Sequence, residues 1–115
     1  MNVIIIERIN KMNNEDFNKC ISKQIDGCLS LLQVKGDEYS KQIDRLKHFK
    51  KAASLQELVP TSALVGMLAK HIVSIYEMSA EPEAYTQEKW KEKIYDAINY
   101  LLLLGALIEE INQNE

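Results

Sequence analysis

Three polar side chains share one stripe of the last helix that the sequence predicts. Glu92, Asp96 and Asn99 stand at positions i, i+4 and i+7, which lie on one face of an α-helix. Two carboxylates one turn apart can share a hard divalent cation, and an amide oxygen can add a ligand. The stripe continues into Leu103 and Ala106, which indicates a partly enclosed cleft rather than open surface. The alternative is a solvated face on which Glu92 pairs with a neighbouring lysine.

A second acidic segment, KGDEYS at residues 35–40, lies between the first two expected helices. Glu38 could face the stripe of Asp96 as a further metal ligand, because helix bundles build metal cores from carboxylates on facing helices. Alternatively, Asp37 and Glu38 only favour the positive end of the following helix. The spacing leaves both interpretations open.

Basic side chains crowd residues 45–51 and recur in the third expected helix. Phosphate oxygens are bound by arginine as a fork and by lysine as a point charge. The candidates for that role are Arg45, Lys47, Lys50 and Lys70. A solvated basic face is the alternative for residues 45–51. His71 lies on the apolar face of its helix, where a core histidine with one satisfied nitrogen is more frequent than a metal ligand.

No nucleophilic or zinc chemistry is indicated. The sequence has no serine-centred elbow, no glycine-rich phosphate loop and no Cys/His zinc spacing, so no catalytic residue is assigned. Cys20 and Cys28 lie eight residues apart in one expected helix, roughly 12 Å at 1.5 Å per residue, which is too far for a disulfide. They are typical of core residues in a reducing compartment.

The elements that must position these residues are helical. Apolar residues recur at helical spacing, and no segment after residue 10 alternates with period two. We expect four main helices: Glu15 to Lys35, Glu38 to Ser54, a third that Thr61 or Ser62 caps and that ends before a break at Ala80 to Tyr85, and a fourth that Thr86 caps and that ends near Ile111. Asn14 is expected to cap the first helix and Gly36 to stop it. The run Val3 to Ile6 could be a short strand or a first helical turn.

The bulk composition limits the function classes. The chain has 115 residues, 46% of them hydrophobic, and 14 basic and 17 acidic residues give a net charge of −3. We expect a single all-α domain over residues 1–115, with 1–13 as an N-terminal extension and 112–115 as a fraying tail. The charge balance argues against general nucleic-acid binding. Without a secretory signal or a window of about 20 apolar residues, we expect a cytoplasmic protein with no membrane span.

Four segments together resemble a known family. They are KGDEYS (35–40), RLKHFKKAA (45–53), GMLAKHIVSI (66–75) and EKIYDAINYLLLL (92–104). In this order they resemble the small MazG-like proteins, most closely the phage and bacterial branch sometimes called nucleotide-modification-associated. The resemblance covers roughly residues 30 to 110. It implies an all-α nucleoside triphosphate pyrophosphohydrolase fold, Mg²⁺ held by acidic residues on facing helices, cleavage between the α and β phosphates, and assembly as dimers or tetramers.

The resemblance also assigns residues to roles. It places Asp96 at the aspartate of the last metal-binding helix, Glu92 at a glutamate often found one turn earlier, and Glu38 at an acidic position before a tyrosine. Asn99 and Tyr100 match the Asn-Tyr pair of the branch, and a second pair, Lys-His, is matched by Lys70 and His71.

Two departures from the family pattern concern the metal site. The usual ExxE pair is missing from the third helix, where Lys70, His71 and Glu77 stand instead. The ExxD pattern is also imperfect, because position 93 is lysine and the glutamate lies four residues before Asp96. With fewer carboxylates, catalysis is the step that these departures put in question, and the fold is not affected.

We therefore expect an oligomeric all-α bundle that hydrolyses or binds (d)NTPs with Mg²⁺, as a homo-dimer or homo-tetramer. The expected metal ligands are Glu38, Glu92, Asp96 and Asn99. The expected phosphate ligands are Arg45, Lys47, Lys50 and Lys70, with His71 and Tyr100 as additional site residues. The alternative is a non-catalytic helical oligomer that acts as an interaction or scaffold protein.

Overall fold

The structure is a computed structural model that describes residues 11–38 and 44–113, with the side chains of 35–38 left out. Its described residues form four α-helices and one short 3₁₀ turn, which confirms the all-α prediction. In chain order the elements are α2 (Asn14–Glu38), α3 (Lys47–Gln56), α4 (Pro60–Ser79), the turn η1 (Pro82–Ala84) and α5 (Gln87–Gln113). The run Val3 to Ile6 and the tail from residue 114 lie outside the described residues.

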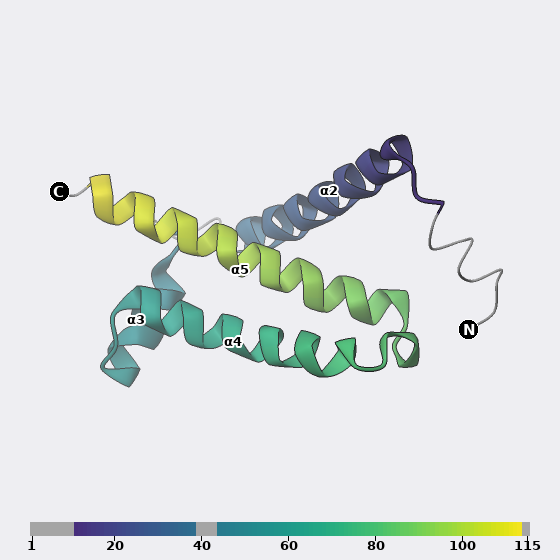
Figure 1. Ribbon diagram of the computed structural model, residues 1–115. Coiled ribbons are helices and arrows are strands. Elements are labelled where there is room, and N and C mark those ends of the chain that lie inside the picture. Colours follow the sequence, from purple (N-terminus) through teal and green to yellow (C-terminus); the bar gives the residue numbers. More distant parts are fainter. Residues whose placement is uncertain (1–10, 39–43, 114–115) are drawn as a thin grey trace.

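The helix α5 is the centre of the arrangement (Figure 1). α4 and α5 run side by side in opposite directions and are joined through η1. α3 packs against α4, and α2 packs against α5 from another side. Among the described residues, no single helix is long and apolar enough to cross a bilayer; α3 and α4 pass that test only as a pair, and they are bent by 95°.

Helix boundaries follow local chemistry, and one expected cap is confirmed. Thr86 accepts a hydrogen bond from the backbone N–H of Lys89 at 3.1 Å, as an N-cap does. At the start of α2 the cap is Asn13 rather than Asn14, because the Asn13 Oδ1 accepts from the N–H of Asp16 at 2.8 Å. α4 begins at Pro60 with no side-chain cap, since proline at the first helical position is already pre-set for the helix.

The expected break at Gly36 was wrong. α2 continues through Gly36 to Glu38, because glycine adopts helical as well as left-handed dihedral angles and stops a helix only in the latter. Glu38 therefore ends the first helix instead of starting the second. The second helix begins later, at Lys47, after a turn in which the Asp44 carboxylate accepts from the N–H of Leu46 at 2.9 Å.

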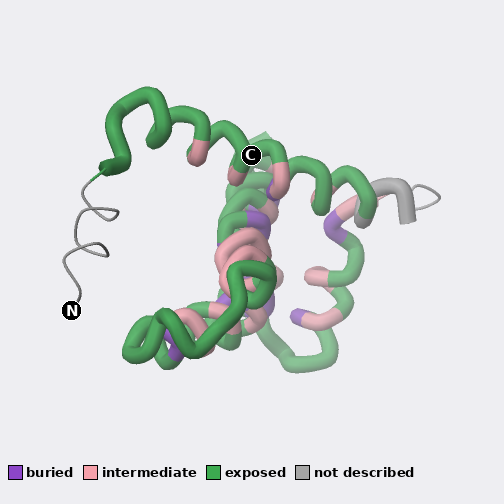
Figure 2. The backbone as a smooth tube through the Cα atoms, turned by 90° about the vertical axis from the view of Figure 1, so that its right-hand side faces the viewer, coloured by how far each residue is buried: buried purple, intermediate pink, exposed green. Residues whose placement is uncertain are grey.

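The core lies between α3, α4 and α5. Leu46, Leu64 and Leu107 form its buried cluster. Four partly buried side chains pack against it: Phe49, Tyr100, Leu103 and Leu104. Figure 2 shows burial concentrated along α5 and the elements that touch it, whereas α2 is mostly exposed. This core fixes the position of α5, whose first half carries Glu92, Asp96 and Asn99.

Candidate functional site

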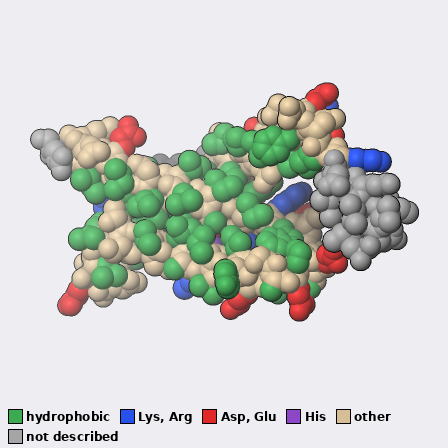
Figure 3. Space-filling view, in the orientation of Figure 1, with side chains coloured by type: hydrophobic (Ala, Val, Ile, Leu, Met, Phe, Trp, Pro, Cys, Tyr) green, Lys and Arg blue, Asp and Glu red, His purple; other side chains and the backbone are tan. Residues whose placement is uncertain are grey.

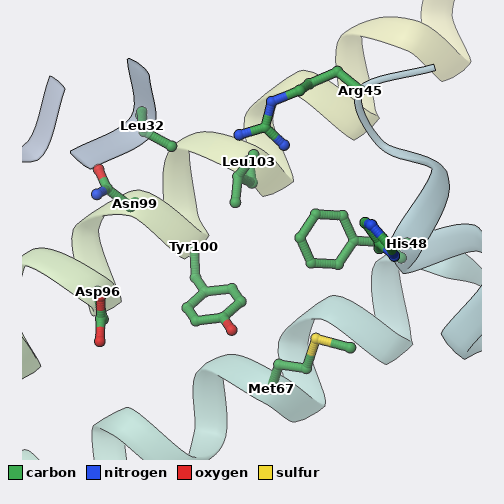
Figure 4. Close-up of a pocket in the computed structure, with 9 residues that line it drawn as sticks. Leu32, Arg45, His48, Met67, Asp96, Asn99, Tyr100 and Leu103 are labelled. Carbon is green, nitrogen blue, oxygen red and sulfur yellow. The ribbon is translucent and has the colours of Figure 1, made fainter. Parts of the chain in front are cut away.

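A pocket of about 230 Å³ opens where α2, the turn before α3, α4 and α5 meet. All four contribute to its lining, and so does α3: Leu32, Arg45, His48, Phe49, Met67, Asp96, Asn99, Tyr100 and Leu103 (Figure 4). The described part of the lining thus combines an apolar wall with two basic side chains and one carboxylate. Because its residues come from distant parts of the sequence, it exists only in the folded chain.

The charged groups of the pocket stand apart from one another. In Figure 4 Asp96 lies on one side of Tyr100, and Arg45 and His48 lie on the other. Arg45 comes from the turn before α3 and His48 from the first turn of α3. A ligand that spans the pocket would therefore meet the cationic groups and the carboxylate at different ends.

Asp96 forms a small cluster with two aromatic groups across the α4–α5 interface. Its Oδ2 lies 3.9 Å from the Nδ1 of His71, too long for a hydrogen bond. The His71 Nδ1 is buried and has no hydrogen-bond partner among the described residues. The His71 ring lies 5.2 Å from the Tyr100 ring. His71 is therefore a partly enclosed histidine beside the site and does not line the pocket itself.

The Tyr100 hydroxyl stays protonated at neutral pH. Burial raises the pKa of Tyr100, and the negative charge of Asp96 raises it further. Both effects disfavour the phenolate, the first by desolvation and the second by repulsion. Tyr100 can therefore offer an O–H donor and a ring face to a ligand.

Asn99 points away from Asp96. It is only 7% exposed, and its Nδ2 donates to the backbone carbonyl of Cys28 on α2 at 3.2 Å. The Asn99 Oδ1 is also buried, and within the described part of the chain it has no hydrogen-bond partner. Figure 4 shows the Asn99 side chain directed toward α2 and the Asp96 side chain in another direction. In this structure Asn99 links two helices and does not meet Asp96 around one point.

The structure does not bring Glu92, one of the two glutamates of the expected metal site, to the pocket. The Glu92 side chain is 57% exposed and lies 3.8 Å from the Lys89 ammonium, which is the surface pair that the alternative interpretation describes. The side chain of Glu38 lies outside the described residues. Within the part of the chain that the structure describes, no three His, Cys, Asp or Glu side chains are close enough together to hold a metal ion.

Of the four expected phosphate ligands, Arg45 lines the pocket. Lys50 is engaged elsewhere, 2.5 Å from Asp44 and 2.7 Å from Glu110. The hydrogen bonds that Lys50 donates to these two carboxylates raise the pKa of Lys50. The hydrogen bond from Lys50 also lowers the pKa of Asp44. Lys47 and Lys70 are exposed and do not contribute to the lining.

Sequence reasoning missed part of the lining. His48 and Phe49 were not among the predicted site residues, although both lie within the basic segment 45–51. The signal was present, because positions 45, 48 and 49 are spaced i, i+3 and i+4 and face one direction. Leu32 and Met67 carried no such signal, since only the tertiary arrangement brings α2 and α4 to this place.

Comparisons with protein-family models, with curated proteins and with solved structures found no match. What this site does is therefore argued from its own chemistry.

Proposed function

We propose that this protein binds nucleoside polyphosphates in the pocket between α2, α3, α4 and α5. The observation that supports this best is the pairing of an apolar, aromatic hollow with Arg45 and His48 on one side and Asp96 on the other. A nucleotide has the matching parts: a flat base, a chain of phosphates and an accompanying Mg²⁺. In this proposal the protein is a nucleoside triphosphate pyrophosphohydrolase or a nucleotide-binding relative of one.

The base fits the apolar part of the pocket. Tyr100 and Phe49 meet edge to face with ring centroids 6.5 Å apart, and apolar side chains from α2, α4 and α5 complete the walls. Pockets for drug-sized ligands measure roughly 300–1,000 Å³. At about 230 Å³ this pocket admits one ring system, so the phosphates would extend toward its mouth.

The phosphates would meet the basic side. The guanidinium of Arg45 offers a planar fork of donors that matches phosphate oxygens. His48, on the next helical turn, can add a donor. Because the chain as a whole carries a net charge of −3, a local pair of basic side chains in a hollow is more specific than a general basic surface.

The fit to a resident metal ion is incomplete. The described residues supply one carboxylate at the pocket, Asp96, while the Asn99 side chain, although part of the lining, is directed toward α2 and donates to the Cys28 carbonyl. Mg²⁺ commonly takes one or two protein carboxylates together with phosphate oxygens and water. Asp96 would hold a Mg²⁺ that arrives with the nucleotide if the phosphate chain runs along the mouth of the pocket, from Arg45 past Tyr100 to the Asp96 side. Binding is the first claim of the proposal, and pyrophosphate release from a dNTP is the second.

A thermal-shift panel of dNTPs and NTPs, with and without Mg²⁺, tests the first claim. A ligand at 100 times its dissociation constant stabilises the folded state by about 2.7 kcal/mol. We expect Arg45→Gln to abolish the shift and Lys51→Gln, an exposed change on α3, to preserve it. No shift with any nucleotide, or an equal shift in Arg45→Gln, would overturn the proposal.

A pyrophosphate-release assay tests the second claim. We expect the wild-type protein to release pyrophosphate from at least one dNTP with Mg²⁺, and the Asp96→Asn protein to release none. Asp96→Asn keeps the side-chain shape and removes the charge that Mg²⁺ requires. A folded Asp96→Asn protein that turns over at the wild-type rate would refute the role of Asp96.

A non-catalytic helical oligomer is the second candidate function. The exposed Glu92–Lys89 pair favours it, and so does the large number of apolar side chains at the surface. This candidate predicts that no nucleotide changes the melting temperature, with or without Mg²⁺. The same thermal-shift panel therefore separates the two functions.

A further inference from the structure

A second pocket, of about 290 Å³, lies between α2 and α5. The two helices contact each other where Gly27 meets Tyr95 and where Cys28 meets Asn99, and Figure 1 shows them separating from there toward their N-terminal ends. Apolar and polar side chains of both helices line the pocket, and we call it the α2–α5 pocket. Its described lining is Cys20, Lys23 and Gln24 from α2 and Gln87, Trp90, Lys91, Ile94 and Tyr95 from α5.

Two aromatic side chains form fixed walls of the α2–α5 pocket. The indole N–H of Trp90 donates to the carbonyl of Pro82 at 2.9 Å, and the Trp90 ring meets the Tyr85 ring edge to face with centroids 6.3 Å apart. The Tyr95 ring lies against Gly27, where a Cβ atom would be 2.6 Å from the tyrosine Cε2. Rings that are already held in place need little ordering when a ligand packs against them, which favours binding. Figure 3 shows hydrophobic side chains on α5 and the neighbouring helices on the face that it draws.

The charged side chains that line the α2–α5 pocket have one sign. Lys23 and Lys91 belong to its described lining, and no described aspartate or glutamate does. Glu88 lies 4.0 Å from the Lys91 ammonium, and 86% of its side chain is exposed. Water screens such an exposed pair, so Glu88 offsets only part of the lysine charge. The charge that remains is more than one and less than two, which suits a singly charged anion better than a doubly charged one.

An amide side chain in the α2–α5 pocket has a weak partner. The Gln24 Nε2 donates to the Cys20 Sγ at 3.2 Å, and a thiol sulfur is a weak acceptor. A carboxylate oxygen would accept a stronger hydrogen bond from this amide, because its charge assists the bond. Sites for small molecules combine apolar and aromatic walls with a few polar groups that orient the ligand. The α2–α5 pocket has this composition.

We propose that the α2–α5 pocket is a second binding site, which takes a small carboxylate that carries an aromatic ring. The ring packs against Trp90 and Tyr95, and the carboxylate meets Lys23 and Lys91 at the mouth of the pocket. A lysine covers apolar surface with its stem and keeps its ammonium in water, so both charges stay available there. This site does not depend on nucleotide binding, because the two pockets share no described lining residue.

The fluorescence of Trp90 tests the site, because Trp90 is the single tryptophan of the chain and lines this pocket. The probe is 3-phenylpropionate, whose ring does not absorb at the wavelengths that excite tryptophan selectively. We expect a saturable change in the emission of the full chain. Neutral 3-phenylpropionamide and doubly charged 2-phenylethyl phosphate should bind more weakly. No saturable change with 3-phenylpropionate, or equal or tighter binding of the amide or the phosphate, would overturn the proposal.

Removing charge tests the two lysines. We expect Lys23→Gln and Lys91→Gln each to weaken binding of 3-phenylpropionate about two- to fivefold, as the loss of one partly exposed ion pair should. The double variant should bind more weakly than either single variant. The matched control is Lys19→Gln, which removes the same charge from α2 at a side chain that is 72% exposed and does not line this pocket. A double variant that binds as tightly as the wild type would overturn the proposal.

Cys20 gives a second readout of where the ligand binds. Cys20 is partly exposed in the pocket, whereas Cys28 is only 2% exposed, so N-ethylmaleimide should label Cys20 in the folded chain. At ten times its dissociation constant, 3-phenylpropionate should slow this labelling about tenfold, as measured by mass spectrometry. Unchanged labelling of Cys20 at a concentration that saturates the fluorescence change would place the ligand elsewhere and overturn the assignment.

Discussion

The two helices that flank α5 are attached to it in different ways. α4 buries apolar side chains against α5: Leu64 is 0% exposed and packs with Leu107, which is 1% exposed. Among the described side chains of α2, only Cys28 is buried, and the contact depends on a hydrogen bond from Asn99 and on the absence of a side chain at Gly27. The hydrophobic effect therefore holds α4 against α5, whereas a close approach of the α2 backbone and one hydrogen bond hold α2 there.

This difference predicts unequal stability along the chain. Phe17, Ile21 and Ile25 on α2 keep 50%, 39% and 54% of their surface exposed, so each gains only part of the free energy that full burial would give. Segments with few buried apolar contacts open locally at low free energy, whereas core helices open only with global unfolding. The α3–α4–α5 unit should therefore be the stable part of the fold, and α2 the part that separates first.

The largest effect is expected in the α3–α4–α5 core. Replacing Leu64 by alanine removes a fully buried side chain and should lower the free energy of unfolding by about 2–5 kcal/mol. Leu55 on α3, which is 87% exposed, is the matched control. Leu55→Ala should change the free energy of unfolding by no more than about 0.5 kcal/mol. Urea denaturation of the two variants checks this. Equal losses would mean that Leu64 does not lie in the packed core.

A smaller effect is expected where α2 approaches α5. A Cβ atom at Gly27 would lie 2.6 Å from the Cε2 of Tyr95, so Gly27→Ala requires the tyrosine ring to move. Overpacking of this kind costs about 1–3 kcal/mol, which outweighs or cancels the helix-propensity gain of about 1 kcal/mol. At Gly66 there is open space, and Gly66→Ala should show that gain alone. If both variants are stabilised equally in thermal denaturation, α2 does not pack on α5 as described.

Local patterns predicted the elements well where a side chain or a periodic stripe controls them. The helical spacing of apolar residues predicted the all-α class, and the side chain of Thr86 predicted where α5 begins. The end of α2 was predicted wrongly, because Gly36 permits a helix stop without enforcing one. A residue that allows two conformations needs the tertiary structure to choose between them.

The site shows the same limit. Spacing put Asp96 and Asn99 on one stripe of α5, but the three-residue step between them turns the Asn99 side chain toward α2 while the Asp96 side chain stays near α4. That small rotation decides whether two groups can reach one ligand, and it depends on where the neighbouring helices lie. Arg45 reached the pocket and Lys50 did not, because Asp44 and Glu110 hold the lysine.

Removing the polar link should loosen α2 without disturbing the core. Asn99→Ala leaves the Cys28 carbonyl without its side-chain donor, which costs about 1 kcal/mol. Hydrogen exchange should therefore accelerate in α2 and stay unchanged in α4, whose packing does not involve Asn99. Uniform acceleration across α2, α4 and α5 would instead mean that α2 belongs to the same cooperative unit as the core.

The smallest effect is expected from the ion pairs of Lys50, which lies on α3 in the stable α3–α4–α5 unit. The hydrogen bond from the Lys50 ammonium, followed by that from the Leu46 N–H, lowers the pKa of Asp44 below its usual 3.8. A carboxyl whose pKa is lowered by folding stabilises the fold above its unfolded pKa and loses this contribution as the pH falls through the folded value. The relevant window therefore lies below about pH 4.

In Lys50→Met the pKa of Asp44 should return toward 3.8, so the fall in melting temperature between pH 6 and pH 3 should be smaller than in the wild type. Lys19→Met is the control, because the Lys19–Glu15 pair leaves both side chains more than 70% exposed and such pairs contribute little. The Lys50 side chain is 37% exposed, so water screens part of its effect as well. An identical acid response in Lys50→Met and the wild type would show that this screening is complete, and that apolar contacts, the Leu46–Leu64–Leu107 cluster and the Phe49–Tyr100 pair among them, hold α3 in place.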